Sequence, residues 1–505
     1  MFAATMETSY DQIIYRGFPY AQTHPDRLAT LASLFGIDPA PVEHCRVLEL
    51  GCGDGANLIP IAFSCPDSEF LGFDLAETPI AMGREAIGEL GLKNVHLEAA
   101  DILQLGPGLG EFDYIIAHGV YSWVPADVRD KLLAIAHDHL APQGVAYISY
   151  NALPGCHIRQ MLRDMMLFHL RDVAAPEDRI REVLDFLRIL RQAPENVENP
   201  TPALLKQEVN SVFERAPEVL FHDELSEVYF PIHFTDFMAH AAGYGLQYLA
   251  EANLHDMEPG RVSNEVREQL EKYSGGRRLE REQYMDFLKC RKFRQTLLCR
   301  ANLEISDTPI VSRVRNMYAA SPATPVSPHP DLTGSRPEEF RGKKGAAMKT
   351  AHPLAKTAIG TLTRMWPAVI HFEKLLAQCG GLIGSPADAE GLAEILLATC
   401  RAGLVELHAY QPACVAHPGE YPSTTALARW QARHGHTVTT LRHTTIEATG
   451  NIETQLLTLL DGTRDHAALA EELGAMMQPP RYGRELRTEI DVNLAKLAKF
   501  GLLIA

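Results

Sequence analysis

Three glycines separated by single residues follow an apolar run in VLELGCGDGANL, residues 47–58. Gly51, Gly53 and Gly55 would permit positive φ angles and a close approach of the backbone to a ligand, and a helix that begins after them would direct its N–H groups there. A P-loop is excluded because no Gly-Lys-Ser/Thr follows, and the dinucleotide pattern G-x-G-x-x-G is not met because Ala56 takes its last place. The spacing therefore predicts a nucleotide-type site for a different ligand.

Acidic residues at the ends of successive predicted strands indicate what that ligand is. Glu49 would repel a pyrophosphate but suit an ammonium group. Asp74 can accept hydrogen bonds from both hydroxyls of a ribose, and Asp101 with Ile102 could hold an adenine by its amino group and its ring face. These groups occur together, without phosphate, in S-adenosylmethionine, which we expect as the cofactor. The alternative is that Asp74 and Asp101 only cap the helices that follow.

A second set of residues, at the expected rim of the site, could receive a methyl acceptor. Tyr121 and Trp123 in HGVYSWVP could wall a narrow channel that binds an amine by apolar and cation–π contact. His118 could accept or orient a proton, and Asn151 could accept a hydrogen bond from the amine. We expect these four as the catalytic residues. The alternatives are that Trp123 packs beneath the next helix and that Asn151 only fixes its own turn.

The lead-in FPYAQTHPD, residues 18–26, places polar groups before a helix that Pro25 could begin. Either Tyr20 and His24 close over the cofactor as a lid, or the segment is a turn in which His24 caps the helix. With the lid included, the residues expected to bind the cofactor are Tyr20, His24, Glu49, Gly51, Gly53, Gly55, Asp74, Leu75, Asp101, Ile102 and His118. No metal ligands are expected.

Alternating strands and helices would position these side chains. Apolar strands are predicted at 45–50, 69–75, 94–100, 112–119 and 144–150, with helical runs between them. This alternation is typical of a doubly wound, Rossmann-like α/β sheet covered on both faces, and ligands of such sheets bind at the carboxyl ends of the strands.

The remaining sequence divides the chain further. With its lid, the first domain would span residues 1–175, and residues 176–320 would form a mostly helical middle region, in which 232–252 could return to complete the sheet. The helical prediction includes residues 281–299. Residues 321–345 are rich in proline, serine and charge and are predicted to be a linker or long loop. A helix–turn–helix pattern near the end predicts a winged-helix-like domain over 346–505.

Composition limits the function. The chain has 505 residues and a formal net charge of −17, which argues against nucleic acid as the partner. Its nine cysteines form no C-x-x-C pair, as expected for free thiols in a reducing compartment. Because the sequence shows neither a signal peptide nor a run long enough to span a bilayer, we expect a cytoplasmic protein without membrane insertion.

The motifs ELGCGDG, FDL and AADI resemble class I methyltransferases. In addition, AHGVYSWVP, YNALPGCHIRQMLRDMM and MDFLKCRKFRQTLLC resemble the bacterial methyltransferases with a methyltransferase regulatory domain, a group that includes rickettsial protein-lysine methyltransferases acting on an outer-membrane protein. The resemblance implies a class I fold, a helical middle region and a C-terminal winged helix. It also implies a protein substrate with accessible lysines, such as an outer-membrane or surface protein. A homodimer is a further expectation. Cys156 departs from the pattern, which usually has tryptophan after the Pro-Gly.

The expected function is therefore S-adenosylmethionine-dependent methyl transfer, with a protein lysine as the acceptor. In-line displacement needs positioning and desolvation more than acid–base chemistry, but a lysine amine must first lose a proton. The alternatives are a small-molecule methyltransferase and a regulator that binds the cofactor, or DNA, without catalysis.

Overall fold

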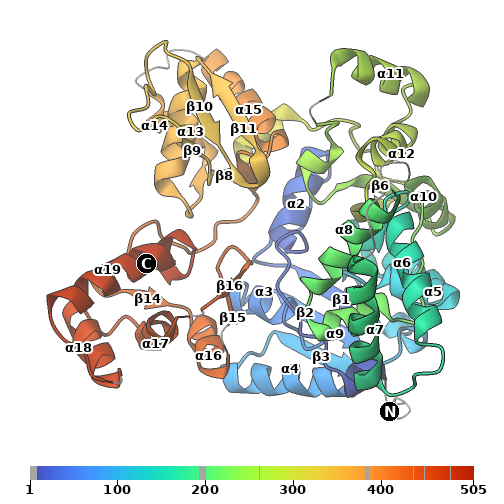
Figure 1. The fold of residues 1–505 in the computed structure, drawn as a ribbon. Helices are drawn as coiled ribbons and strands as arrows, with labels where there is room; N and C mark the ends of the chain where they lie inside the picture. Colours follow the sequence, from blue (N-terminus) through green and yellow to red (C-terminus); the bar gives the residue numbers. More distant parts are fainter. Residues whose placement is uncertain are drawn as a thin grey trace.

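In the computed structural model, which describes residues 8–192, 201–260, 262–380, 386–435, 437–448, 450–477 and 479–505, a seven-stranded sheet lies at the centre. Its strands run in the order β3-β2-β1-β4-β5-β7-β6, and β7 runs antiparallel to the other six strands (Figure 1). The strands are β1 (Arg46–Leu50), β2 (Glu69–Asp74), β3 (Val95–Ala99), β4 (Phe112–Ala117), β5 (Leu140–Asn151), β6 (Leu246–Glu251) and β7 (Phe293–Arg300). All five strands predicted before residue 150 form, and residues 246–251 do return to the sheet.

The apolar runs form this sheet because successive side chains point to opposite faces and both faces are covered. Val47 packs into the core on one face, and Leu48, the next residue, packs into the core on the other. The first face is covered by α2 (Pro25–Leu34), α3 (Leu58–Ser64) and α4 (Glu77–Leu90). The second is covered by α5 (Ala126–His139) and α10 (Phe234–Gly243).

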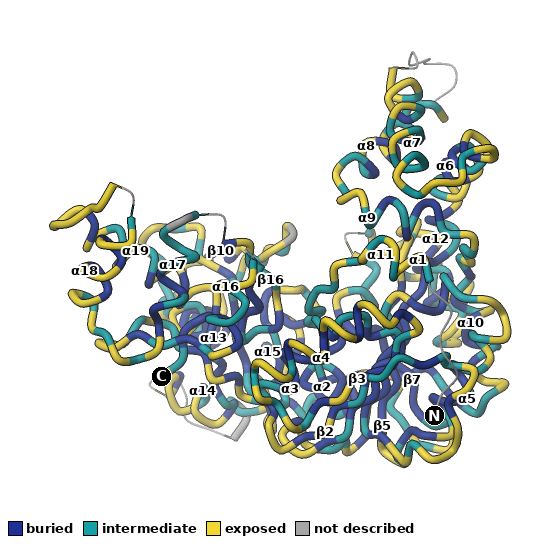
Figure 2. The backbone as a smooth tube through the Cα atoms, turned by 90° about the horizontal axis from the view of Figure 1, so that it is seen from below, coloured by how far each residue is buried: buried dark blue, intermediate teal, exposed yellow. Residues whose placement is uncertain are grey.

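The helical middle region has a small core of its own. Leu162, Val183 and Val209 meet where α6 (His157–His169), α7 (Pro176–Arg191) and α8 (Thr201–Phe213) pack together. Figure 2 shows these three helices standing away from the body of the molecule. The region continues through α9 (Pro217–Val219), α10, α11 (Asn264–Ser274) and α12 (Arg278–Lys289).

The helix predicted over residues 281–299 is wrong in its second half. α12 ends at Lys289, Cys290 adopts the left-handed conformation with φ of 45°, and residues 293–300 form β7 between β5 and β6. The fully buried Arg294 holds this strand against α12 and β6. Its guanidinium donates to Asp286 Oδ1 and Oδ2 at 2.9 and 2.8 Å and to Glu251 Oε1 at 2.5 Å. The ion pairs of Arg294 and the pairing of this strand with β5 and β6 thus outweigh the local helical pattern.

Residues 321–345, predicted to be a linker or long loop, include a loop at 326–337 but do not form a linker between domains. This segment contains β9 (Thr324–Pro325) and β10 (Glu338–Arg341), and Phe340 is fully buried with Ala323, Ile359 and Leu404. β10 pairs with β11 (Ala347–Thr350), so the domain boundary predicted at 346 falls inside a sheet. The unit is completed by β8 (Tyr318–Ala320), β12 (Ile370–His371), β13 (Glu406–His408), α13 (Pro353–Met365), α14 (Phe372–Gln378) and α15 (Pro386–Arg401).

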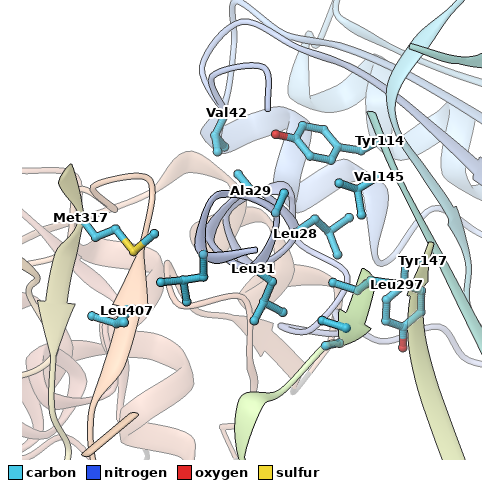
Figure 3. Close-up of a cluster of buried hydrophobic side chains, with 14 of the residues drawn as sticks. Leu28, Ala29, Leu31, Val42, Tyr114, Val145, Tyr147, Leu297, Met317 and Leu407 are labelled. Atoms are coloured by element: carbon cyan, nitrogen blue, oxygen red, sulfur yellow. The ribbon is translucent and has the colours of Figure 1, made fainter. Parts of the chain in front are cut away.

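Helix α2 joins this unit to the central sheet. Figure 3 shows Leu28 and Leu31 of α2 within one buried cluster that has sheet residues on one side and residues of the second unit on the other. The sheet contributes Val145, Tyr147 and Leu297, and the second unit contributes Met317 and Leu407. The two units therefore share one hydrophobic core.

The last hundred residues form a separate core of helices with a short hairpin, as the helix–turn–helix pattern predicts (Figure 1). The hairpin joins β15 (Thr437–Thr439) to β16 (Thr445–Glu447). The other elements are β14 (Ser423–Thr424), α16 (Ala426–His434), α17 (Asn451–Leu459), α18 (His466–Met476), α19 (Arg484–Lys499) and β17 (Leu503–Ile504). A hydrogen bond of 2.6 Å from Trp430 Nε1 to Glu89 Oε2 connects α16 to α4 of the first domain.

Candidate active site

A cavity of about 840 Å³ opens at the carboxyl ends of the parallel strands. The N-terminal segment, which includes the short helix α1 (Ser9–Gln12), forms one wall, and residues of the helical middle region form another. Most of the residues predicted from the sequence line it, namely Tyr20, Glu49, Gly51, Gly53, Asp74, Leu75, Asp101, Ile102, His118, Trp123 and Asn151. The fold thus gathers residues that lie more than a hundred positions apart in the chain.

The glycine turn forms the floor of the cavity. Gly51 and Gly53 have φ angles of +75° and +54°, and a Cβ atom on Gly51 would lie 2.5 Å from Val120 Cγ2. The N–H of Gly53 donates to Asp74 Oδ2 at 2.8 Å, which ties the turn to the end of β2. Gly55 is not among the lining residues. A Cβ there would lie 2.7 Å from Leu97 Cδ1, so this glycine permits close packing and does not contact a ligand in the way that was predicted.

Glu49 is a buried carboxylate with one oxygen left for a ligand. Its Oε1 accepts a hydrogen bond from Asn57 Nδ2 at 2.8 Å, whereas Oε2 has no partner among the described residues. Burial raises the pKa of Glu49 to about 8, although the Asn57 hydrogen bond opposes the shift. A buried acceptor without a partner is costly, and the ammonium of an amino-acid group would satisfy it. The residues present therefore fit the cofactor predicted from the sequence.

Asp74 and Asp101 accept hydrogen bonds from nearby backbone N–H groups and also face the cavity. Asp74 Oδ1 accepts from the Ala76 N–H at 2.9 Å, and Asp101 Oδ1 accepts from the Leu103 N–H at 2.9 Å. The capping alternative is thus correct for Asp101, which caps the 3₁₀ turn Ile102–Gln104, but not for Asp74, because the N-cap of α4 is Ala76. Both carboxylates nevertheless line the cavity, next to the apolar side chains of Leu75 and Ile102. This is the combination that a ribose and an adenine ring require.

The rings of His118 and Tyr20 lie in contact at the cavity wall, tilted by 39° to each other. Their ring centroids are 3.9 Å apart, and His118 Nδ1 lies 2.9 Å from Tyr147 Oη. Burial lowers the pKa of His118 to about 4, so the imidazole is neutral at physiological pH and is a weak base. Tyr20, which was predicted to belong to a lid, lines the cavity, and its N–H donates to Asn57 Oδ1 at 3.0 Å.

His24, which was also predicted to belong to the lid, does not line the cavity. Its Nδ1 accepts a hydrogen bond from the Asp26 N–H at 3.1 Å, so it caps α2. The alternative interpretation of this residue is therefore the correct one. This orientation of the His24 side chain is favourable because the first N–H groups of a helix need acceptors.

Tyr121 was predicted to face the acceptor, and this is wrong. A 3₁₀ turn at Tyr121–Trp123 directs the two aromatic side chains differently, and only Trp123 lines the cavity. Tyr121 is buried against Phe237, with ring centroids 5.1 Å apart, and its hydroxyl lies 2.8 Å from His240 Nδ1. Tyr121 therefore belongs to the core beneath α10, although it was predicted to lie at the rim of the cavity.

One wall of the cavity was missed by the sequence prediction. It contains Tyr10 and Tyr15 of the lead-in and Asp223 of the middle region. Tyr10 stacks on His222, with ring centroids 4.0 Å apart and ring planes 8° apart. Burial raises the pKa of Asp223 to about 6. Three tyrosines at intervals of five residues, counting Tyr20, were a usable signal in the lead-in, but nothing local marked Asp223.

Arg159 joins this wall to two of the predicted acceptor residues. Its guanidinium lies 5.3 Å from the Trp123 ring centroid, 3.4 Å from Asn151 Oδ1 and 3.7 Å from Asp223 Oδ2. Asn151 Nδ2 is buried and has no partner in the part of the chain that the structure describes. A polar ligand group that reached this wall would therefore meet an acid, an amide and aromatic faces together. Cys156 also lines the cavity, and its Sγ donates to Lys292 O at 3.0 Å.

The described residues contain neither a candidate metal site nor a candidate membrane span. No group of three or more histidine, cysteine or acidic side chains among the described residues could hold a metal ion. Within the same residues, no helix is both long and apolar enough to cross a membrane. All nine cysteines are described and are free thiols.

Three family models match parts of the chain. A methyltransferase domain matches residues 48–146, a predicted methyltransferase regulatory domain matches 216–300, and the C-terminal winged helix domain of PKMT matches 420–481. The last match lies within the helices and hairpin that follow residue 410.

Individual proteins resemble the chain over greater lengths. The uncharacterized protein RP789 of Rickettsia prowazekii (strain Madrid E) is 32% identical over 478 residues, which cover 92% of this chain and 85% of that protein. RP028 of the same organism is 37% identical over 241 residues, 48% of this chain and 96% of that protein. The structure of PKMT2 from Rickettsia typhi in complex with AdoHcy superposes with a TM-score of 0.86 and 28% identity, covering 97% of this chain and 100% of that one.

Proposed function

We propose that this chain, which belongs to the methyltransferase family that combines a methyltransferase domain, a regulatory domain and a PKMT winged helix, methylates lysine side chains of protein substrates. It is an S-adenosylmethionine-dependent methyltransferase with a class I fold. Our proposal goes beyond this activity in one respect, namely that a lysine side chain accepts the methyl group. The wall formed by Tyr10, Tyr15 and Asp223 beside the cofactor residues is the observation that carries it.

We assign the cofactor to the predicted residues that line the cavity. Glu49 Oε2 would take the ammonium group, Asp74 the ribose hydroxyls, and Asp101 the adenine amino group, with Leu75 and Ile102 against the ring. When bound, S-adenosylmethionine supplies a methyl group on a positively charged sulfur. The chain has to hold an acceptor nitrogen in line with that carbon and keep water out.

The acceptor wall suits an amine. Asp223 attracts an ammonium group by charge, and the faces of Tyr10, Tyr15 and Trp123 attract it by cation–π contact. The pKa of Asp223 is about 6, so the carboxylate is ionised at neutral pH and can accept the proton that the amine must lose before it attacks. His118, with a pKa of about 4, is the weaker candidate for this task. We therefore propose Asp223 in place of Tyr121 as the residue that prepares the amine.

The net charge of −17 favours a basic substrate such as a lysine-bearing polypeptide over nucleic acid. The free thiols favour a reducing compartment, so the cytoplasmic location stays part of the proposal. An outer-membrane or surface protein as the substrate, and a homodimeric assembly, are also parts of it and rest on the family resemblance.

The test is methylation of a bacterial lysate by the purified protein with methyl-labelled cofactor, followed by mass spectrometry. Lysine residues heavier by one or more methyl groups are expected. Label found only in small molecules would instead make the chain a small-molecule methyltransferase.

Asp223→Asn tests the acceptor wall. On the lysine substrate found in this way, kcat/KM is expected to fall about 100-fold, the usual scale for general acid–base groups, while the Kd for S-adenosylhomocysteine stays within about twofold. Asp172→Asn, at an exposed position beside Arg171, is the matched control and should change neither value. Full activity of the Asp223 variant would exclude this residue from the acceptor site.

A further inference from the structure

The hairpin of the C-terminal domain reaches the cofactor-binding half of the molecule. Its tip carries His443, which is buried and adopts a left-handed conformation with φ of 51°. The His443 ring packs edge-on against His24, with ring centroids 5.3 Å apart. A residue other than glycine with positive φ is uncommon and carries strain that the surroundings must hold in place.

The side chain of Asn57 connects this tip to the cofactor site. Asn57 Oδ1 accepts hydrogen bonds from the Tyr20 N–H at 3.0 Å and from Thr23 Oγ1 at 3.1 Å, and His443 Nε2 lies 2.9 Å away. On its other side Asn57 Nδ2 donates to Glu49 Oε1 at 2.8 Å. One amide thus links the lid, the carboxylate and the C-terminal hairpin.

The direction of each hydrogen bond is fixed. A backbone N–H can only donate, so the Asn57 oxygen must face Tyr20, and its NH₂ group must face Glu49. His443 must therefore donate through Nε2. Burial lowers the pKa of His443 well below its usual value, so the ring is neutral and carries its single proton on Nε2.

The neighbouring residue anchors the hairpin tip in place. Arg442 Nη2 donates to His408 Nε2 at 3.0 Å, and His408 Nδ1 lies 2.6 Å from Asp26 Oδ2 on α2. Arg442 also pairs with Glu406. The guanidinium of Arg442 lies 4.8 Å from the Trp366 ring centroid. These contacts cross from the last domain through the second unit to the first, so the tip cannot rotate without breaking them.

We propose that His443 is a positioning residue for cofactor binding: it fixes the Asn57 amide, and through it holds Glu49 so that Oε2 meets the ammonium group. The inference rests on the proposed place of that ammonium. It means that docking of the winged-helix domain and binding of the cofactor stabilise each other, because coupling between two binding events is reciprocal.

Two amide substitutions in the full-length protein test the proposal. His443→Asn keeps a residue that tolerates positive φ but is too short to reach Asn57, whereas His443→Gln can place a donor close to the position of Nε2. By calorimetry, His443→Asn is expected to raise the Kd for S-adenosylhomocysteine about tenfold, and His443→Gln to stay within about threefold of the unchanged protein. Trp430→Phe removes a different hydrogen bond between the same two domains and is expected to leave this Kd unchanged.

A second ligand separates positioning from a general loss of structure. 5′-Methylthioadenosine lacks the amino-acid group that Glu49 would bind, so His443→Asn should leave its Kd within about twofold of the unchanged protein. An equal loss for both ligands, or no loss for S-adenosylhomocysteine, would overturn the proposal. Failure of the unchanged protein to bind S-adenosylhomocysteine would instead contradict the assigned cofactor site.

A measurement on the unchanged protein covers the case in which both variants fail to fold. S-adenosylhomocysteine is expected to slow amide hydrogen exchange of residues 437–447 more than that of α18 and α19 in the same domain. Exchange of the hairpin that does not respond to the ligand would also overturn the proposal.

Discussion

At the scale of single residues, Glu49 combines deep burial with one unpaired oxygen at the cofactor cavity. Asp74 and Asp54 are nearby negative charges that raise the pKa of Glu49 further, after the larger effect of burial. The carboxylate is thus protonated at neutral pH until a cation arrives. Its arrangement favours a ligand that brings a positive charge.

The affinity for S-adenosylhomocysteine is therefore expected to rise with pH. The ammonium binds ionised Glu49, whose pKa is about 8, so binding releases a proton below that pH and Kd should fall by up to about tenfold per pH unit between pH 6 and 8. In the ligand-free protein, the stability changes with pH in the opposite direction to the affinity. The raised pKa contributes stability at low pH, which is lost as the pH rises through about 8.

Titration calorimetry at pH 6, 7 and 8 gives this measurement, and Glu49→Gln is the control. The amide cannot ionise, so its weaker binding should not vary with pH in this range. A pH-independent Kd for the unchanged protein would place the ammonium elsewhere.

Among the secondary-structure elements, the 3₁₀ turn Tyr121–Trp123 decides which of its two aromatic residues lines the cavity. Its tight winding separates the two side chains, and the neighbouring α10 offers Tyr121 an apolar surface and the ring nitrogen of His240. Trp123 is left at the cavity and lies against Arg159.

Tyr121→Phe is expected to keep full methyltransferase activity. It removes only the hydrogen bond to His240, so the free energy of unfolding should fall by ~1 kcal/mol. Trp123→Ala is the contrasting variant, because it opens the acceptor wall and should lower kcat/KM. Steady-state kinetics and chemical denaturation check both. A large loss of activity in Tyr121→Phe at unchanged stability would return this residue to the active site.

At the scale of the whole molecule, the parts are joined by shared cores and hydrogen bonds. Helix α2 packs on the sheet and on the second unit at once, and the C-terminal domain contacts the first through His443 and Trp430. The segment 321–345 belongs to this packed body. We therefore expect the cofactor site to depend on distant parts of the chain.

Phe340→Ala is expected to destabilise the protein by about 3–5 kcal/mol, the usual cost of emptying a buried aromatic site. A true linker would tolerate the change. Val326→Ala, at a position 48% exposed in the same segment, is the matched control and should cost less than ~0.5 kcal/mol. Urea denaturation of both variants measures the difference. Equal stabilities would mean that the segment contributes little to the core.

The central sheet, the helices between its strands and the side of the cavity that we assign to the cofactor could be predicted from the sequence. Glu49, Asp74 and Asp101 could be placed because parallel strands bring their carboxyl ends to one edge, so that position in the chain predicts position in space. The return of residues 246–251 was predicted from a different signal, a helical run followed by glycine and a strand-like run.

Only the tertiary structure decided the rest. Asp223 and His443 reach the site from distant elements, and their places depend on how those elements pack. Tyr121, His24 and the strand 293–300 differ from the prediction because local patterns allow two outcomes, and packing selects one. The relative positions of side chains that are close in sequence follow from helix and strand geometry. The contacts between side chains that are far apart in sequence depend on the free energy of burying and pairing them.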